Sequence, residues 1–524
     1  MTCIGFDILS VLIFLPLAGI LLIAGVSKDK PGVIKGITFL TALVNFLVSL
    51  LLYRAFDSTT HEFQFTTTFP WVEEYGISYH LGIDGISLFL VLLTTFLTAL
   101  SVIACWKDIQ EKVKGFMICL LLLETGVIGV FVSLDLFLFY IFWEVMLIPM
   151  YLLIGVWGAP ARRIYAAVKF FLFTMFGSLL MLVAILVLYF YNHSVTGTYT
   201  FLLEDLYKLS IPYGMQIWLF LAFALAFAIK VPMFPFHTWL PDAHTEAPTV
   251  GSVLLAAVLL KMGTYGFLRF NLPLFAEATL AFVPLMSILA IIGIVYGALV
   301  CIVQKDLKRL IAFSSVSHLG FVVLGIFALN IQGLEGGILQ MLNHGFSTGA
   351  LFLIVGMIYE RRHTRLIEEF GGLSRVMPVF ATFFMIVTLS SVGLPGLNGF
   401  VGEFLILLGA FRANAAYAVF AALGVIFAAV YMLWMFQRVM FGEVTREANM
   451  KLKDLSLREV CVLLPLVFFI IQIGVYPRPF LSRMDASVKH LISQVESKTS
   501  QRGAEGMRMA FSGADARHER TGVR

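Results

Sequence analysis

The sequence predicts an all-α polytopic membrane protein with about fourteen transmembrane helices. Of its 524 residues, 60% are hydrophobic and 13% are charged, whereas soluble domains carry roughly a quarter of charged residues. Apolar runs that reach the roughly 20 residues needed to cross a bilayer occupy most of the chain. A soluble globular fold is therefore excluded, and we expect residues 1–477 to form one transmembrane domain.

Fourteen apolar segments predict the individual spans. The first has no preceding basic region and no A-x-A cleavage site, so we interpret it as a helix that stays rather than a cleaved signal. Only residues 133–135 separate the fourth span from the fifth. The approximate ranges are 8–26, 33–54, 84–106, 115–133, 135–156, 164–191, 215–235, 248–270, 279–303, 309–329, 335–359, 379–410, 414–441 and 459–477.

Charges in the loops predict the orientation. Basic residues gather in alternate loops, whereas the intervening loop 55–83 is acidic. Because basic loops lie on the cytoplasmic side, both termini are expected on the opposite side. The basic loop residues are Lys28, Lys30, Lys35, Lys107, Lys112, Lys114, Arg162, Arg163, Lys305, Lys308, Arg309, Arg361, Arg362 and Arg365.

Residues 478–524 form a separate C-terminal tail. They hold nine Lys and Arg against five Asp and Glu, which accounts for the whole net charge of +4, so no nucleic-acid partner is indicated. Apolar residues at helical spacing over 481–495 predict an amphipathic helix at the membrane interface. The polar stretch after Ser497 predicts disorder.

No motif for a cofactor is present. The cysteines Cys3, Cys105, Cys119, Cys301 and Cys461 lack C-x-x-C spacing, and there is no glycine-rich nucleotide loop. His237 and His244 lie with Asp242 and Glu246 in one short segment, which raises a metal site as an alternative. Prolines interrupt that segment, so a helix-linking turn or a proton path is the preferred interpretation.

Lys230 and Glu144 are the first candidate site residues. Lys230 ends an apolar run and is followed by Pro232 and Pro235, so a transmembrane helix breaks beside a buried ammonium. Broken charged helices form the ion sites of transporters. Glu144 lies in an aromatic and aliphatic segment. If the two residues face each other, a change in their separation acts as a proton switch; the alternative is a static buried ion pair or a neutral packed acid.

Four further titratable residues lie within predicted spans. Lys261 is flanked by Gly263 and Gly266, which allow another helix or water to approach; its alternative role is a lysine that snorkels to the interface. His318 and His344 have serine and asparagine neighbours, and suit a proton relay or a satisfied hydrogen-bonding role. Glu403 follows a run of glycines that breaks its helix.

Three other charged residues are less clear candidates. For Glu124 the functional and the packing interpretations are balanced. For Lys305 and Asp306 a helix anchor is preferred to a proton path.

The spacing of these residues hints at an internal repeat. Glu144 precedes Lys230 by 86 residues, and His318 precedes Glu403 by 85. In each pair the second residue lies in a helix interrupted by proline, although Lys230 precedes its break and Glu403 follows Pro395. Paired broken segments are typical of inverted-repeat transporters.

Five segments resemble one family. They are KVPMFPFHTWLPDAHTEAPT at 230, HLGIDGISLFLVLLT near 80, FYIFWEVMLIPMYLLIG at 139, AFSSVSHLGF at 312 and GLPGLNGFVGEF at 393. They are similar to the antiporter-like subunits of proton-pumping NADH–quinone oxidoreductase, respiratory complex I, which are themselves similar to subunits of multi-subunit Na⁺/H⁺ antiporters. The chain looks most like the subunit M group, the counterpart of mitochondrial subunit 4, because Glu403 stands where sister subunits carry lysine.

The resemblance implies a fold and a set of roles. It implies two inverted five-helix repeats, approximately 115–270 and 279–441, with discontinuous helices. It implies Glu144 and Lys230 as an ion pair, Lys261 as the central relay, His318 and His344 as connecting groups and Glu403 as the exit-side carboxylate. NADH, FMN, iron–sulfur clusters and quinone are then expected only in partner subunits.

The expected function is therefore proton translocation as a subunit of complex I. The expected partners are other membrane subunits, including two sister antiporter-like subunits, and the lipid bilayer. The expected location is the bacterial inner membrane, with the mitochondrial inner membrane as the alternative. Two rival functions are a subunit of a Na⁺/H⁺ antiporter and a scaffold whose charged row is structural.

Overall fold

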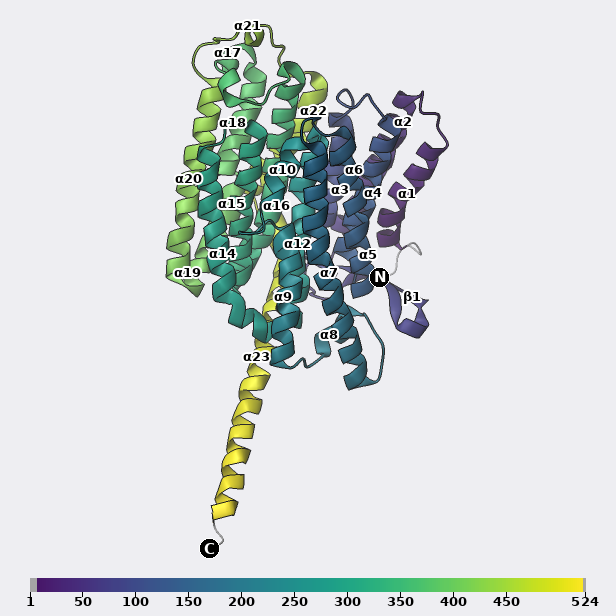
Figure 1. The fold of residues 1–524 in the computed structure, drawn as a ribbon, viewed down its shortest axis with the longest axis vertical. Coiled ribbons are helices and arrows are strands. Elements are labelled where there is room, and N and C mark those ends of the chain that lie inside the picture. The colour runs from purple at the N-terminus through teal and green to yellow at the C-terminus, as the bar shows by residue number, and fades with distance from the viewer. Residues whose placement is uncertain (1–6, 522–524) are drawn as a thin grey trace.

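The computed structural model describes residues 7–521, with side chains described for residues 7–500. Helices make up most of the molecule and run side by side in one bundle (Figure 1). In the described part, eleven helices are long and apolar enough to cross a membrane, and the apolar helices Ile8–Ala24, Leu88–Ala104 and Pro378–Val392 are shorter. Each of the fourteen predicted ranges contains a helix, which confirms the polytopic membrane class.

The first half of the chain runs from α1 to α13. Its α-helices are α1 (Ile8–Ala24), α2 (Pro31–Ala55), α3 (Leu88–Ala104), α4 (Val113–Val132), α5 (Leu136–Val145), α6 (Leu147–Trp157), α7 (Arg163–Thr196), α8 (Leu203–Lys208), α9 (Tyr213–Lys230), α10 (Trp239–Glu246), α11 (Thr249–Leu254), α12 (Leu260–Gly266) and α13 (Leu272–Leu274). Two π-helical turns, η2 (Leu255–Leu259) and η3 (Phe267–Asn271), join α11, α12 and α13 into one span.

The second half runs from α14 to α23. Its helices are α14 (Ala276–Ile302), α15 (Leu307–Phe327), α16 (Ile331–Arg362), the 3₁₀ turn η4 (Ile367–Glu369), α17 (Leu373–Val376), α18 (Pro378–Val392), α19 (Asn398–Ala413), α20 (Ala415–Met440), α21 (Glu447–Met450), α22 (Leu457–Val475) and α23 (Arg478–Thr521). Figure 1 shows α17 and α21 at one end of the bundle and β1, α8 and the distal part of α23 at the other.

The prediction of an all-α chain is wrong in one element. Between α2 and α3, β1 (Gln64–Val72) and β2 (Ile77–Ile83) pair as an antiparallel hairpin, with Gly76 in a left-handed conformation (φ 63°) after the 3₁₀ turn η1 (Glu73–Tyr75). Threonines and aromatic residues fill β1, and such residues favour strands. The acidic charges used to assign this segment to a loop carry no information about strand pairing.

Helix breaks lie beside three candidate residues. Helix α9 ends at Lys230, where Pro232 and Pro235 cannot continue it. The chain between α18 and α19 passes through Gly393 and Gly396, whose positive φ angles of 82° and 92° suit glycine. A third break, which the sequence analysis did not predict, separates α5 from α6 at Met146, because Pro149 has no N–H to donate to Val145.

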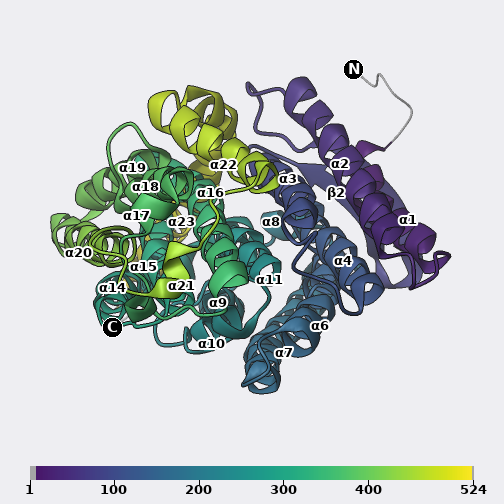
Figure 2. The ribbon, with the colours of Figure 1, turned by 90° about the horizontal axis from the view of Figure 1, so that it is seen from above.

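Three spans form the buried centre of the bundle. The spans Thr249–Leu274, Leu307–Phe327 and Ile331–Arg362 are covered by protein along their whole apolar windows, whereas α2, α7, α20 and α22 expose apolar flanks. Figure 2 shows α16 inside the bundle, with α20 and α7 on its outside. The three buried spans are those that carry Lys261, His318 and His344.

The tail helix α23 packs on the bundle rather than lying in the membrane interface. Met484, Val488, Leu491 and Val495 are buried, and the helix contacts α13, α14 and α16. The predicted interfacial placement of 481–495 is therefore wrong, because protein covers the apolar stripe. The helix continues to Thr521 and leaves the bundle (Figure 1). Disorder after Ser497 stays a prediction, and Cys3 lies outside the described residues.

Candidate functional site

Lys230 lies at the broken end of α9 in an aromatic pocket. It is 1% exposed, and its Nζ lies 3.4 Å from the sulfur of Met146, the residue at the α5–α6 break. The rings of Trp143 and Phe170 lie 5.4 Å and 5.6 Å from the same amine. Aromatic faces stabilise a cation only in part, so the ammonium keeps a strong preference for a carboxylate partner.

Glu144 supplies that carboxylate from the last turn of α5. It interacts electrostatically with Lys230, and the hydroxyls of Ser178 and Tyr140 lie close to its carboxylate. Its Oε1 is buried without a hydrogen-bond partner, and no N–O distance of 4.0 Å or less joins it to Lys230. The structure therefore brings the two predicted partners together without a direct ion pair.

Lys261 lies on α12, next to the helix of Lys230 and deeper in the bundle. It is fully buried on α12 between the two π-helical turns, and its Nζ donates to the carbonyl oxygen of Ala256 at 2.6 Å. Gly263 faces α9: a Cβ at this position would stand 2.8 Å from the carbonyl oxygen of Phe227 and 3.1 Å from Cβ of Lys230. The predicted close approach at Gly263 is confirmed, and it places the helices of Lys230 and Lys261 in contact.

His344 of α16 is the partner of Lys261. Its Nδ1 lies 2.6 Å from the lysine Nζ. At this distance one atom donates and the other accepts, which is satisfied by an ammonium beside a neutral imidazole, by an imidazolium beside a neutral amine, or by the two neutral groups. Two adjacent cations in a buried site are strongly disfavoured, so the pair carries at most one positive charge.

His318 of α15 continues the row to Glu403 of α19. The rings of His344 and His318 are 6.1 Å apart between centroids, and Nε2 of each is buried without a hydrogen-bond partner. On its other side, Nδ1 of His318 lies 3.1 Å from Oε1 of Glu403. Unpaired buried polar atoms in such a site are usually satisfied by ordered water, so the two Nε2 atoms suit a water-bridged relay.

Amides that sequence reasoning missed hold Glu403 in place. Gln340 of α16 donates to Oε1 of Glu403 at 3.2 Å, and Asn343 donates to Gln340 at 3.0 Å. Asn343 also donates to the carbonyl oxygen of Asn398 at the start of α19, at 2.8 Å. Their spacing of three residues on α16 was a usable signal, because Gln340 and Asn343 fall on the same helical face.

Lys308 is a second residue that was missed. The sequence analysis counted it as a loop charge, but it is 5% exposed and its amine donates to the carbonyl oxygen of Ala247. A cavity of about 430 Å³ at the basic-loop end is lined by Lys308, Glu246 and Asp108. Asp306 caps α15 and pairs with Arg365 at 3.1 Å, which supports its interpretation as a helix anchor.

His244 lies near both Lys308 and Lys261. It is fully buried on α10, stacks on Phe352 with centroids 4.6 Å apart, and has no hydrogen-bond partner on either ring nitrogen. It interacts electrostatically with both lysines. Asp242, in contrast, forms ion pairs with Lys169 at 2.7 Å and Arg309 at 3.7 Å. In the described chain, no group of three potential ligands is arranged for a metal ion.

Glu124 lies apart from this row. It is buried on α4, and its Oε1 accepts a hydrogen bond from Asn45 of α2 at 2.9 Å. Asn45 also donates to the carbonyl oxygen of Leu12 in α1 at 3.2 Å. This contact joins the first helices of the chain, which favours the packing interpretation.

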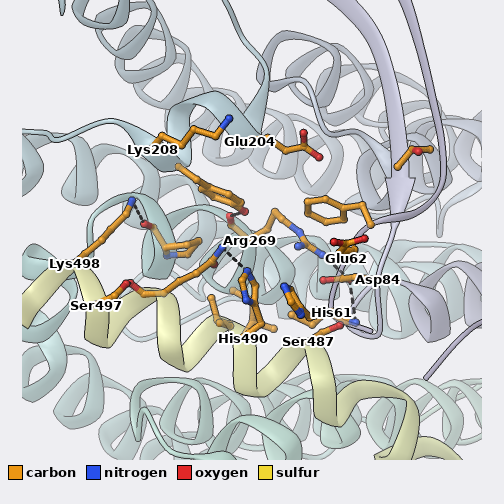
Figure 3. A pocket seen from close by; sticks show the side chains of 18 residues that line it. His61, Glu62, Asp84, Glu204, Lys208, Arg269, Ser487, His490, Ser497 and Lys498 are labelled. Carbon is orange, nitrogen blue, oxygen red and sulfur yellow. Dashed lines mark hydrogen bonds and ion pairs between the residues drawn. The ribbon is translucent and has the colours of Figure 1, made fainter. Parts of the chain in front are cut away.

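A polar cavity of about 580 Å³ lies at the opposite end of the bundle, where the hairpin, α8 and α23 meet (Figure 3). The ion pair between Arg269 and Asp84, 2.6 Å apart, lies at the wall of this cavity, and His61 stacks on His490 with centroids 3.9 Å apart. Burial lowers the pKa of His490, and burial lowers the pKa of Lys498 to about 8.

Two family models match the chain. The model described as NADH:quinone oxidoreductase/Mrp antiporter, TM, matches residues 133–470, and the model described as NADH-ubiquinone oxidoreductase chain 4, amino terminus, matches residues 11–129. The chain belongs to the subunit M (chain 4) family of NADH–quinone oxidoreductase. The resemblance seen in the sequence is confirmed.

Curated relatives match most of the chain. It is 48% identical to NADH-quinone oxidoreductase subunit M of Rhodobacter capsulatus over 498 residues, which are 93% of this chain and 96% of the relative. It is also 48% identical to NADH-ubiquinone oxidoreductase chain 4 of Marchantia polymorpha over 484 residues, 92% of this chain and 97% of that one.

Solved structures agree with the family. A chain of respiratory complex I from Thermus thermophilus matches with a TM-score of 0.82 and 35% identity, over 92% of this chain and 99% of that chain. A chain of the Mrp complex from Dietzia matches with a TM-score of 0.79 over 93% of this chain and 99% of that one, but its identity of 20% supports the fold alone.

Proposed function

We propose that this chain translocates protons as a membrane subunit of NADH:quinone oxidoreductase. The observation that carries the proposal is the buried series Lys261, His344, His318 and Glu403. Polar atoms of the first pair lie 2.6 Å apart and those of the last pair 3.1 Å apart, and the two histidine rings lie 6.1 Å apart between centroids. Ionisable groups inside a membrane protein are costly and are retained for transport or catalysis. Each member of the series can both accept and release a proton.

Lys308 and His244 provide an uptake branch for this series. The cavity at the basic-loop end reaches the buried amine of Lys308, and the charges of Lys308 and Lys261 both act on His244. The unpartnered ring nitrogens of His244 suit it to carry a proton from the cavity side to Lys261. This branch gives the row a source of protons at the end of the bundle with the basic loops.

Lys230 and Glu144 act as the switch of the row. In the present arrangement they interact without a direct ion pair, and Met146 lies against the ammonium. Moving Glu144 closer stabilises the charged Lys230, whereas moving it away favours the neutral amine and releases a proton. Redox energy from partner subunits would drive this change through the adjoining α5–α6 break.

The chain would do no redox chemistry itself. NADH, FMN, iron–sulfur clusters and quinone would be bound in partner subunits of the complex. Its neighbours would be other membrane subunits, including the two sister antiporter-like subunits, in a bacterial or mitochondrial inner membrane. The site residues in this chain need only accept, hold and release protons.

The finer architecture belongs to the same proposal. Fourteen membrane-spanning segments, with inverted five-helix repeats near 115–270 and 279–441, are supported by the helix found in each of the fourteen predicted ranges. The breaks beside Lys230 and before Glu403 would then occupy related positions in the two repeats. The similarity to the complex I chain at a TM-score of 0.82 is consistent with this division.

A Na⁺/H⁺ antiporter subunit is the weaker alternative. The relatives at 48% identity are named as oxidoreductase subunits, and the Mrp chain is only 20% identical. The second alternative is that the row of buried charged residues has only a structural role. It would predict that substituting the row damages assembly and leaves proton transfer per assembled complex unchanged.

The test is Lys261→Met in the assembled complex. Membrane vesicles would be assayed side by side for NADH-driven quinone reduction and for proton uptake, with assembly checked on a native gel. Loss of uptake by at least about tenfold is expected, since a positioned acid or base contributes this much or more. The exposed Lys305→Met is the matched control. Normal uptake in an assembled Lys261→Met complex would overturn the proposal.

A further inference from the structure

An apolar groove of about 240 Å³ lies between α2, α3, α16 and α22. Its wall is aromatic: the ring of Phe469 lies 5.1 Å from Phe346 and 5.5 Å from Phe96, and Phe96 lies 5.4 Å from Phe46. Figure 2 shows α2, α3 and α22 next to one another at the edge of the bundle.

The groove is closed toward the centre of the bundle and open toward its outer surface. Leu342 and Phe346 of α16 are buried at its inner side, whereas Leu50 and Phe468 at its rim are 39% and 59% exposed. The apolar flanks of α2 and α22 continue on either side of this rim. The mouth therefore opens onto an apolar surface at membrane depth, where the surrounding solvent is hydrocarbon.

One end of the groove is polar. Tyr53 and Gln472 line it near the ends of α2 and α22, and the guanidinium of Arg483 lies 4.0 Å over the ring of Tyr53. Among the described residues, Oε1 of Gln472 and Nε of Arg483 are buried without hydrogen-bond partners. An unsatisfied guanidinium nitrogen at such an end calls for an anionic acceptor.

The spacing of polar and apolar groups matches an amphiphile. From Tyr53 to Phe46 the groove follows α2 for seven residues, about 10 Å of helical rise. Over this depth its wall changes from Gln472 and Tyr53, with Arg483 beside the Tyr53 ring, to aromatic and aliphatic side chains. A phospholipid has the same order, with a phosphate at the interface and a hydrocarbon chain below it.

We propose that the groove binds one acyl chain of an anionic phospholipid, with its phosphate held by Arg483. The bound chain would pack on Leu342 and Phe346, which face away from His344 because two residues turn an α-helix by about 200°. Leu93, which also lines the groove, contacts the same turn of α16 at Gly345. The lipid would thus support the helix that presents His344 to Lys261.

The test uses the whole complex in lipid nanodiscs. The probe is phosphatidylglycerol with a photoreactive diazirine in its acyl chain, and the labelled residues are mapped by peptide mass spectrometry. Leu92→Trp fills the groove, and the exposed Leu47→Trp on α2 is its matched control. Arg483→Gln removes the headgroup contact, and the exposed Arg478→Gln on the same helix is its control. A native gel confirms assembly of each variant.

Labelling is expected at Phe468, Phe469 and Leu92. We expect Leu92→Trp to reduce it about tenfold, and Arg483→Gln to abolish the preference for phosphatidylglycerol over a phosphatidylcholine probe, with both controls unchanged. Labelling that is equal in all variants would overturn the proposal, since it indicates surface lipid only. Stronger labelling by a photoreactive quinone, or occupation of the groove by a neighbouring subunit, would also overturn it.

Discussion

The amine of Lys261 lies 2.6 Å from Nδ1 of His344 and, equally, 2.6 Å from the carbonyl oxygen of Ala256. The carbonyl can only accept a hydrogen bond, whereas the imidazole can accept or donate. The amine therefore has one fixed partner and one that changes with protonation. In the proposed function, this asymmetry would let a proton pass to His344 while the lysine keeps its bond to Ala256.

Replacing His344 by glutamine separates proton transfer from hydrogen bonding. Glutamine still offers an acceptor to Lys261 but cannot take up a proton. We expect the His344→Gln complex to assemble and to lose proton uptake per NADH by at least about tenfold. The measurement is the ratio of proton uptake to quinone reduction in vesicles. A normal ratio would show that His344 serves Lys261 only as an acceptor.

Lys230→Ala and Glu144→Ala are expected to reduce proton pumping while leaving the complex assembled. Without Glu144 the ammonium of Lys230 keeps only aromatic and sulfur contacts, and without Lys230 the carboxylate loses its nearby charge. Proton uptake during NADH oxidation checks both variants, with the exposed Lys451→Ala as the control. Normal pumping by an assembled Glu144→Ala complex would remove the switch from the mechanism.

Gly263→Ala is expected to separate α12 from α9. The new Cβ would stand 2.7 Å from Val231 and 2.8 Å from the carbonyl oxygen of Phe227, and such overpacking costs about 1–3 kcal/mol. A lower thermal midpoint of the purified complex and weaker pumping are the expected results. Gly214→Ala is the control on α9, because nothing lies within 4 Å of its Cβ. Equal behaviour of the two variants would contradict the close contact.

Docking of α23 beside His61, in the segment before β1, is expected to weaken as the pH falls. Burial and the adjacent His61 hold the pKa of His490 below its ordinary value of 6.5. The docked state therefore prefers the neutral imidazole. The contribution of this group to docking is complete above pH 6.5 and is lost as the pH falls below that value. Arg269 also disfavours the imidazolium, whereas Asp84 favours it.

Hydrogen exchange of residues 478–500, measured against α22 between pH 8 and pH 5, tests this docking. After correction for the pH dependence of the intrinsic exchange rates, we expect faster exchange at low pH. His490→Phe keeps the ring contact and removes the titration, so its exchange should not depend on pH in this way. The same pH response in both proteins would assign the effect to another group.

The sequence predicted the elements whose causes are local. Pro232 and Pro235 end α9 by a local effect that does not depend on packing. The glycines before Glu403 likewise break a helix by their own conformational freedom. The hairpin at Gln64–Ile83 was missed because strand pairing depends on two segments meeting, and the acidic charges of the loop gave no sign of it. The break at Met146 was missed although Pro149 is its local cause.

The site was predicted in part for the same reason. A lysine or glutamate within an apolar run is visible in the sequence, so Lys230, Lys261 and Glu403 were found. Lys308 was assigned to a loop, because its burial comes from α10 and α16 packing around the start of α15. That Lys261 contacts His344, 83 residues away, follows from helix packing that no local pattern encodes.

The π-helical turn before Lys261 has a consequence for how this site tolerates sequence change. Ala256 lies in the π-helical turn η2, and its main-chain carbonyl oxygen accepts a hydrogen bond from the side-chain amine of Lys261. One of the two partners of the lysine amine is thus a main-chain atom, and no substitution of a neighbouring side chain deletes that acceptor. The side chain at position 256 can therefore vary without loss of this acceptor, whereas inserting or deleting one residue between positions 256 and 261 would misplace the charge.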